Sequence, residues 1–130
     1  MSNINLINKE LKQVNNLIKK DIIKERTVSK LYKYIFRSSG KQLRAKLSLI
    51  SSSSDKKIRL RRYKLAAVIE LLHTATLVHD DVVDESEIRR GTKSVNNIWS
   101  NAHGVLIGDY IYSKAFMLMV ELGNPKILDE

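Results

Sequence analysis

The sequence predicts an all-α protein that forms one domain over residues 1–130. Apolar residues recur at helical spacing along several segments, no segment shows convincing strand alternation, and the chain contains a single proline. With 130 residues, of which 43% are hydrophobic, the chain is long enough to bury a real core. No internal repeat is present.

The first half of the chain is expected to hold three helices. One face of the first segment is apolar, and Ser29 is the expected N-cap of the second. Ser38 to Gly40 form a loop, and the serines at positions 51–54 interrupt the pattern again. The predicted helices cover residues 3–25, 29–36 and 43–50.

The second half is expected to hold two long helices and one short helix. A charged loop over residues 85–92 separates the first long helix from the rest. The predicted helices cover residues 57–84, 95–100 and 104–122. The expected buried side chains of the first of them are Leu65, Val68, Ile69, Leu72, Leu77 and Val78.

Composition narrows the class of protein further. The chain has no cysteine, which excludes a disulfide framework and a Cys-based metal site. No early apolar run resembles a signal peptide, and the longest apolar stretches are too short to span a membrane. We therefore expect a cytoplasmic protein. The net charge of +9 indicates an anionic partner or a solvated basic surface.

A run of six basic residues between Lys56 and Lys64 has the charge of a nucleic-acid patch. Tyr63 is the only aromatic residue within it, and no nucleic-acid motif surrounds it. The pattern favours a solvated helix face, and we expect no nucleic-acid partner.

Acidic residues gather in one place, since five of the fourteen lie between Asp80 and Glu87. On a helix, Asp80 and Asp84 lie one turn apart on the same face, with His73 two turns before Asp80. Like charges at this spacing repel, and a divalent cation between them would offset that cost. Paired carboxylates suit Mg²⁺, which completes its shell with water and substrate phosphates. A DDxxD string alone is a weak signal, because acidic helix ends also occur by chance.

Two cationic clusters flank these acids. Arg89 and Arg90 follow them, and Lys41 and Arg44 come after Gly40 at a predicted loop-to-helix junction. Guanidinium groups of arginine and the N-termini of helices both bind phosphate oxygens. Each cluster taken singly is more often surface charge, but together they suit two phosphorylated ligands.

Three stretches of the chain, in order, resemble blocks of the polyprenyl synthetase family, in a pattern closest to octaprenyl and other long-chain polyprenyl diphosphate synthases. They are Gly40–Arg44, the run from His73 through Asp84 to Gly91, and Gly108–Phe116. The resemblance implies the isoprenoid synthase fold, a bundle of antiparallel helices around a cavity, usually in a homodimer. This chain would form its N-terminal part.

The resemblance also implies Mg²⁺ as cofactor and isopentenyl diphosphate and an allylic prenyl diphosphate as substrates. Asp80 and Asp84 would bind the metal, with Asp81 assisting, and Arg89 would hold the allylic diphosphate. Isopentenyl diphosphate would be held by Lys41, Arg44, His73 and Arg90. The implied chemistry is ionisation of the allylic C–O bond, attack by the isopentenyl double bond, and proton loss.

Chain length in this family is set just upstream of the acidic motif, at positions that correspond to Ala75 and Thr76. Neither residue is aromatic, which favours a long-chain, membrane-associated product. Ordinary packing of small residues on a helix is compatible with the same two residues.

The chain also departs from the family pattern. Gln42 stands where the family usually has Arg, and Ala45 where it has Pro. No second acidic motif follows Asp109, which leads us to expect an interrupted chain. Three hypotheses stay open: a prenyltransferase active with a complementing C-terminal chain, a non-catalytic remnant or partner subunit that retains diphosphate binding, and a basic nucleic-acid binder.

Overall fold

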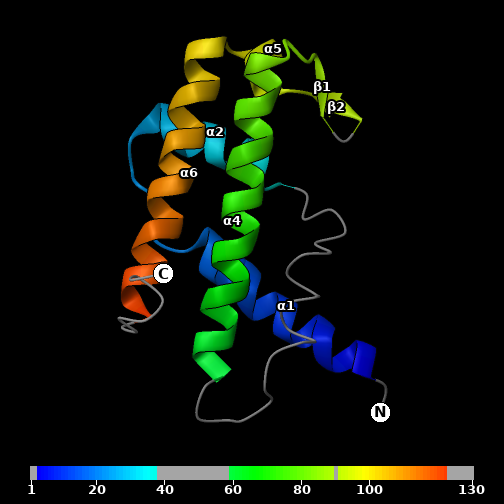
Figure 1. Ribbon diagram of the computed structural model, residues 1–130, viewed down its shortest axis with the longest axis vertical. Helices are drawn as coiled ribbons and strands as arrows, with labels where there is room; N and C mark the ends of the chain where they lie inside the picture. The colour runs from blue at the N-terminus through cyan, green and yellow to red at the C-terminus, as the bar shows by residue number, and fades with distance from the viewer. Residues whose placement is uncertain (1–2, 38–58, 90, 123–130) are drawn as a thin grey trace.

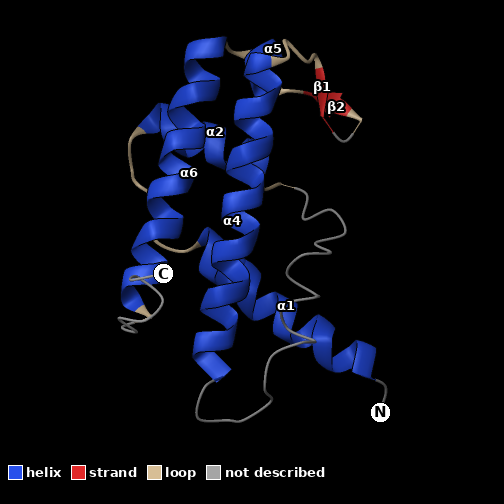
Figure 2. Ribbon diagram, viewed as in Figure 1, coloured by secondary structure: helices blue, strands red, loops and turns tan. Residues whose placement is uncertain are grey.

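The computed structural model describes residues 3–37, 59–89 and 91–122. This part of the chain is helical apart from one small hairpin, which confirms the all-α prediction (Figures 1 and 2). The helices are α1 (Asn3–Lys19), α2 (Arg26–Ile35), α4 (Arg59–Val83), α5 (Val95–Ile98) and α6 (Asn101–Glu121). The hairpin pairs β1 (Ile88–Arg89) with β2 (Thr92–Lys93) in antiparallel register.

The long helices α4 and α6 run antiparallel, side by side, along the length of the molecule (Figure 1). Two glycines of α6 allow their close approach. A Cβ atom on Gly104 would lie 2.6 Å from Val82 Cγ2, and one on Gly108 would lie 2.2 Å from His79 Nε2. Both distances are far below van der Waals contact. The α4–α6 contact therefore depends on the absence of side chains at these two positions.

The core lies where α4 meets α1, α2 and α6. On α4 its most deeply buried residues are small, with Ala66, Ala67 and Ala75 fully buried beside Leu71. On α2, Tyr32 is fully buried and donates a hydrogen bond to the Ile18 carbonyl at the end of α1. Burial raises the pKa of Tyr32. The buried hydroxyl thus has a backbone partner and links the first two helices.

The alanine-lined face of α4 differs from the predicted one. Val68 and Val78 are buried as predicted, but Leu65 is 38% exposed. The fully buried positions are instead Ala66, Ala67, Leu71 and Ala75, whereas Ile69, Leu72 and Leu77 are only half-buried. Hydrophobicity alone therefore predicted the wrong centre for this helix face.

The first two helix boundaries differ from those predicted. The first helix ends at Lys19 rather than at residue 25, because Asp21 adopts a left-handed backbone conformation with φ of 53°. The second helix begins at Arg26, and its N-cap is Glu25 rather than Ser29. The Glu25 carboxylate accepts a hydrogen bond from the Val28 amide at 2.7 Å.

Two further predictions were wrong in the second half of the chain, one for a loop and one for the start of a helix. The expected charged loop contains the β1–β2 hairpin, whose turn uses Gly91 at φ of +78°, a conformation that favours glycine. Helix α6 begins at Asn101 rather than near residue 104, because Ser100 caps it by accepting from the His103 amide. The helix expected over residues 43–50 lies outside the described residues.

The basic run that extends into the first turns of α4 is less solvated than predicted. Within its described part, Arg62 is buried and lies 3.0 Å from a carboxylate oxygen of Glu10 on α1. The half-buried Lys64 lies 3.5 Å from Glu121 at the end of α6. These side chains tie α4 to its neighbours. Among the described helices, none is both long and apolar enough to cross a membrane.

Candidate functional site

The acidic motif lies at the C-terminal end of α4. The Asp84 amide donates to the Asp80 carbonyl at 2.8 Å, so the helical turn continues from one aspartate to the other. Both side chains are exposed. Within the described part of the chain, neither carboxylate takes part in an ion pair. The two acids are therefore open on one side of the helix end.

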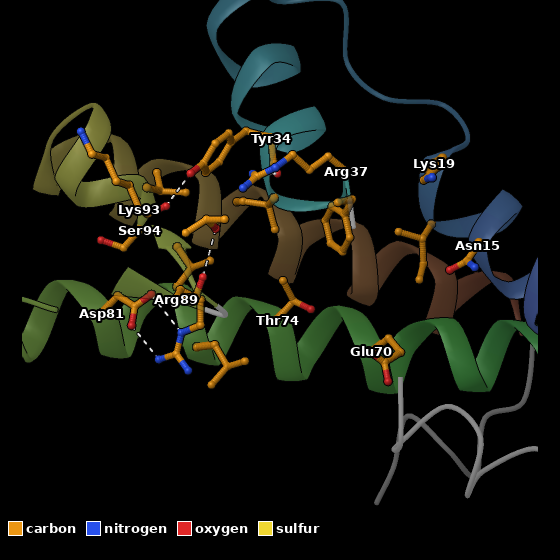
Figure 3. A pocket seen from close by; sticks show the side chains of 17 residues that line it. Asn15, Lys19, Tyr34, Arg37, Glu70, Thr74, Asp81, Arg89, Lys93 and Ser94 are labelled. Carbon is orange, nitrogen blue, oxygen red and sulfur yellow. Dashed lines mark hydrogen bonds and ion pairs between the residues drawn. The ribbon is translucent and has the colours of Figure 1, made fainter. Parts of the chain in front are cut away.

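The aspartate between them has a different environment. Asp81 is 3% exposed and faces Arg89, which belongs to the hairpin (Figure 3). Arg89 Nη2 donates to Asp81 Oδ1 at 2.6 Å, and Nε donates to Oδ2 at 3.2 Å. Successive helix residues are rotated by about 100°, which turns Asp81 inward while Asp80 stays outside. The three aspartates thus contribute one buried and two exposed carboxylates.

The segment that carries Arg89 is tied to the end of α4 by a second set of hydrogen bonds. The Asp81 carbonyl accepts from the Ser86 amide at 2.9 Å and from Asn96 Nδ2 at 3.3 Å. Ser94, which is 2% exposed, donates its hydroxyl to the Ser86 carbonyl at 2.7 Å. These bonds close the chain between α4 and α5 into a compact unit, so the position of Arg89 is defined by backbone contacts as well as by Asp81.

The charge of Arg89 is reinforced by its surroundings. Its hydrogen bonds to Asp81 raise the pKa of Arg89 above its ordinary value, and the negative charges of Asp80 and Asp84 act in the same direction. The guanidinium is therefore a permanent cation placed beside two unpaired carboxylates. A cation and two open anions in one place can bind a metal ion and an anion together.

A cavity of about 190 Å³ lies next to Arg89 (Figure 3). Its walls come from the end of α1, the end of α2, the middle of α4 and the hairpin region. Apolar and charged side chains both line it. The apolar wall consists of Ile18, Ile35, Phe36, Leu77, Val78 and Val95, and the basic residues are Lys19, Arg37, Arg89 and Lys93.

Some of the predicted site residues lie elsewhere. His73 is half-buried on α4 and has an interaction partner. Ala75 is fully buried in the core, in the manner of ordinary small-residue packing. Thr76 is exposed, and its hydroxyl lies 3.0 Å from the hydroxyl of Tyr112 on α6. Lys41, Arg44 and Arg90 lie outside the described residues.

The sequence reasoning missed several residues that shape the site. Ser94 and Asn96 hold the loop that carries Arg89, and the Tyr34 hydroxyl donates to the Lys93 carbonyl at 2.5 Å. The only sign of Ser94 and Asn96 in the sequence was that both are short polar residues at the start of the predicted helix over residues 95–100. Nothing in the sequence indicated that Tyr34, far from this loop along the chain, contacts it.

The donor chemistry of the acidic end fits Mg²⁺. The described residues contain no cluster of three or more His, Cys, Asp or Glu side chains that would enclose a metal ion by themselves. Two exposed carboxylates on one helix turn supply hard oxygen ligands and leave most of the shell open. Mg²⁺ is typically bound in this way, by one or two carboxylates together with water and substrate phosphates.

Comparison with known proteins identifies the family of this chain. Residues 25–130 match the sequence profile described as polyprenyl synthetase. The all-trans-nonaprenyl-diphosphate synthase of Rhodobacter capsulatus is 43% identical over 104 residues, which cover 79% of this chain and 32% of the relative. The octaprenyl diphosphate synthase of Escherichia coli is 41% identical over 102 residues, covering 78% and 32%. The chain belongs to the polyprenyl synthetase family.

Solved structures give the same result for the fold. The polyprenyl synthase from Caulobacter crescentus CB15, complexed with calcium and isoprenyl diphosphate, matches with a TM-score of 0.82 and 36% identity. The match covers 97% of this chain and 39% of that one. The chain spans about a third of the length of the curated relatives.

Proposed function

We propose that this chain supplies the first half of the active site of a Mg²⁺-dependent prenyltransferase, which condenses isopentenyl diphosphate with an allylic diphosphate. The observation that carries the proposal is the end of α4, where Asp80 and Asp84 are exposed beside the fixed cation Arg89 and form no ion pair with any described residue. Family membership supports it, since the named relatives are polyprenyl diphosphate synthases.

Each group has a defined role in this proposal. Asp80 and Asp84 hold Mg²⁺, which when bound neutralises charge on the diphosphate of the allylic substrate. Arg89 donates N–H groups to the same diphosphate. The allylic C–O bond breaks and the diphosphate leaves with the electron pair. The isopentenyl double bond then attacks the allylic carbon, and loss of a proton restores a double bond. Fixed charges stabilise the leaving group, because they need no reorganisation as its charge develops.

The remaining substrate contacts and the product follow from the family resemblance. Lys41, Arg44, His73 and Arg90 would bind isopentenyl diphosphate, and Thr76 on the exposed side of α4 would border a growing long prenyl chain. Such a product is apolar enough to enter membranes, while the diphosphate end stays polar. We expect the enzyme itself in the cytoplasm, either as a homodimer or with a complementing C-terminal chain.

A chimera tests the proposal directly. The matching N-terminal third of the Escherichia coli octaprenyl diphosphate synthase is replaced by this chain, and product is measured with both diphosphates and Mg²⁺. We expect long-chain product, and loss of at least a hundredfold in rate for Asp80→Asn or Asp84→Asn, on the order expected when groups that stabilise transition-state charge are removed. Glu87→Gln removes a nearby exposed charge and should retain activity. A folded chimera without activity, or an active one that tolerates both aspartate changes, would contradict the proposal.

The 130-residue chain assayed by itself adds a second measurement. It contains one acidic motif, so one side of the proposed metal site has no ligands of its own. We expect Mg²⁺-dependent binding of diphosphate without condensation. Robust product from this polypeptide alone would overturn that expectation. Binding without restoration of activity in the chimera would favour the alternative, a non-catalytic partner that retains diphosphate affinity.

A further inference from the structure

Asp81 and Arg89 form a pair in which only one partner is open to solvent. The Asp81 side chain is 4% exposed, whereas the Arg89 side chain is 40% exposed. Both carboxylate oxygens of Asp81 accept from Arg89, one from Nη2 and one from Nε. A buried carboxylate with both oxygens occupied is poorly placed to bind a metal ion on the outer side of the helix.

The geometry of the pair decides which donors of Arg89 remain available. A guanidinium has five N–H groups arranged along distinct edges. Asp81 takes the edge formed by Nε and Nη2. Among the described residues, no hydrogen bond engages the edge formed by Nη1 and the second N–H of Nη2, so this edge can bind another anion in the same two-bonded manner. Arg89 can therefore hold Asp81 and a phosphate group simultaneously.

The backbone around Asp81 gives the residue a second positioning contact. Its carbonyl accepts from the Ser86 amide and from Asn96 Nδ2, which fixes the start of the loop that leads to Arg89. The side chain holds the far end of the same loop through Arg89. Asp81 therefore contacts both ends of the segment that carries the arginine.

We infer that Asp81 is a positioning residue, which holds the Nε–Nη2 edge of Arg89 so that the Nη1–Nη2 edge faces the diphosphate. This inference rests on the proposed function for the identity of the ligand. It gives the three aspartates different roles, since Asp80 and Asp84 face the metal whereas Asp81 acts through Arg89. Removal of Asp81 leaves the arginine charged but free to rotate, so its affinity for diphosphate falls because ordering it then costs entropy.

The pair itself is tested in the 130-residue chain without ligand. In ¹⁵N-labelled protein, the Arg89 Nε–H signal, assigned by its loss in Arg89→Lys, is expected to exchange slowly with water. Asp81→Asn should abolish this protection, and Glu87→Gln, which removes an equal charge nearby, should retain it. The signal should stay protected when inorganic diphosphate and Mg²⁺ are added. An Nε–H that exchanges as fast as that of an exposed arginine, or that loses protection when diphosphate binds, would contradict the inference.

A double-mutant cycle tests the action through Arg89. Binding of inorganic diphosphate with Mg²⁺ is measured by titration calorimetry for Asp81→Asn, Arg89→Lys and the double variant. We expect roughly tenfold weaker binding for each single variant, as for loss of a hydrogen bond to a charged group. The double variant should match Arg89→Lys within about twofold, since the second change removes nothing further. Losses that multiply would show that Asp81 acts independently and would overturn the inference.

The Mg²⁺ dependence separates the aspartates. Asp81→Asn should leave the Mg²⁺ concentration for half-maximal diphosphate binding unchanged within about twofold, whereas Asp80→Asn should raise it about tenfold or more. A large shift for Asp81→Asn would identify it as a metal ligand and contradict the inference. Absence of any diphosphate binding by the wild-type chain, with the Arg89 Nε–H still protected, would instead contradict the proposed function.

Discussion

Two arginine–carboxylate pairs lie at opposite ends of α4, and they differ in how far water reaches them. At the N-terminal end, the side chains of Arg62 and Glu10 are 6% and 8% exposed. At the C-terminal end, Asp81 is equally buried but Arg89 is 40% exposed. The first pair is closed on both sides. The second pair leaves one edge of its arginine open to a ligand.

The surroundings of the pairs explain the difference. Arg62 and Glu10 come from two packed helices, α4 and α1, whose side chains cover both charges. Arg62 Nη1 lies 3.0 Å from Glu10 Oε2. Arg89 comes from a short hairpin at the margin of the fold and makes two aligned bonds to Asp81. The first pair is therefore enclosed between helices, whereas the second lies at the margin of the fold with its arginine partly open to solvent.

The largest loss of stability is expected from Arg62→Met. This change leaves Glu10 buried without its cation, and breaking a buried ion pair from one side typically costs about 3–5 kcal/mol. Chemical denaturation of the 130-residue chain measures the free energy of unfolding. The exposed neighbour in Arg61→Met serves as control and should change stability by less than about 0.5 kcal/mol. Equal losses in the free energy of unfolding for Arg62→Met and Arg61→Met would show that burial of the arginine makes no difference.

A smaller loss of stability is expected from Arg89→Met. Asp81 then loses both donors, and leaving a buried acceptor unsatisfied costs about 1–3 kcal/mol. The open side of the pair lets water replace part of the lost interaction, which keeps the cost below that of Arg62→Met. The same denaturation experiment compares the two variants. If Arg89→Met destabilises the chain more than Arg62→Met, the second pair is primarily structural and the comparison fails.

Asp84→Asn is expected to change stability in the opposite direction and to make the chain more stable than wild type. Asp80 and Asp84 repel one another at a spacing of four residues, and Asp84 lies at the negative end of the α4 dipole. Removing this charge should raise the free energy of unfolding by about 0.3–1 kcal/mol. Mg²⁺-dependent diphosphate binding should disappear in the same variant. A destabilised Asp84→Asn protein would show that this carboxylate has a structural partner instead.

The smallest change in stability is expected at an exposed charge, the Glu25 carboxylate at the start of α2. Its hydrogen bonds to the Val28 and Thr27 amides lower the pKa of Glu25 below its ordinary value of 4.5. A lowered pKa means that the stabilising contribution is complete above pH 4.5 and is lost as the pH falls through the pKa of the folded state. Glu25→Gln should therefore be less stable than wild type at pH 7, and the difference should close as the pH falls below the lowered pKa of Glu25. A difference that is constant with pH would exclude the charged cap.

The sequence predicted most of the secondary structure and the placement of Asp80 and Asp84 at one helix end, for reasons that are local. Helical periodicity indicated α1, α4 and α6 because it depends only on the spacing of apolar residues. Boundaries failed where a backbone conformation decided them, as at Asp21, or where a longer side chain capped the helix, as Glu25 does in place of Ser29. The hairpin at Gly91 was missed because two-residue strands are too short to show alternation.

The sequence by itself determined that Asp80 and Asp84 share one side of a helix end, because a spacing of four residues specifies this in any α-helix. It also determined that cations follow them closely along the chain. Only the tertiary structure decided that Asp81 faces inward to Arg89 and that Arg62 is buried against Glu10. Burial depends on which helices cover a position, and those neighbours come from distant parts of the chain. That Asp81 is buried while Asp80 and Asp84 are exposed is therefore a property of the packed molecule.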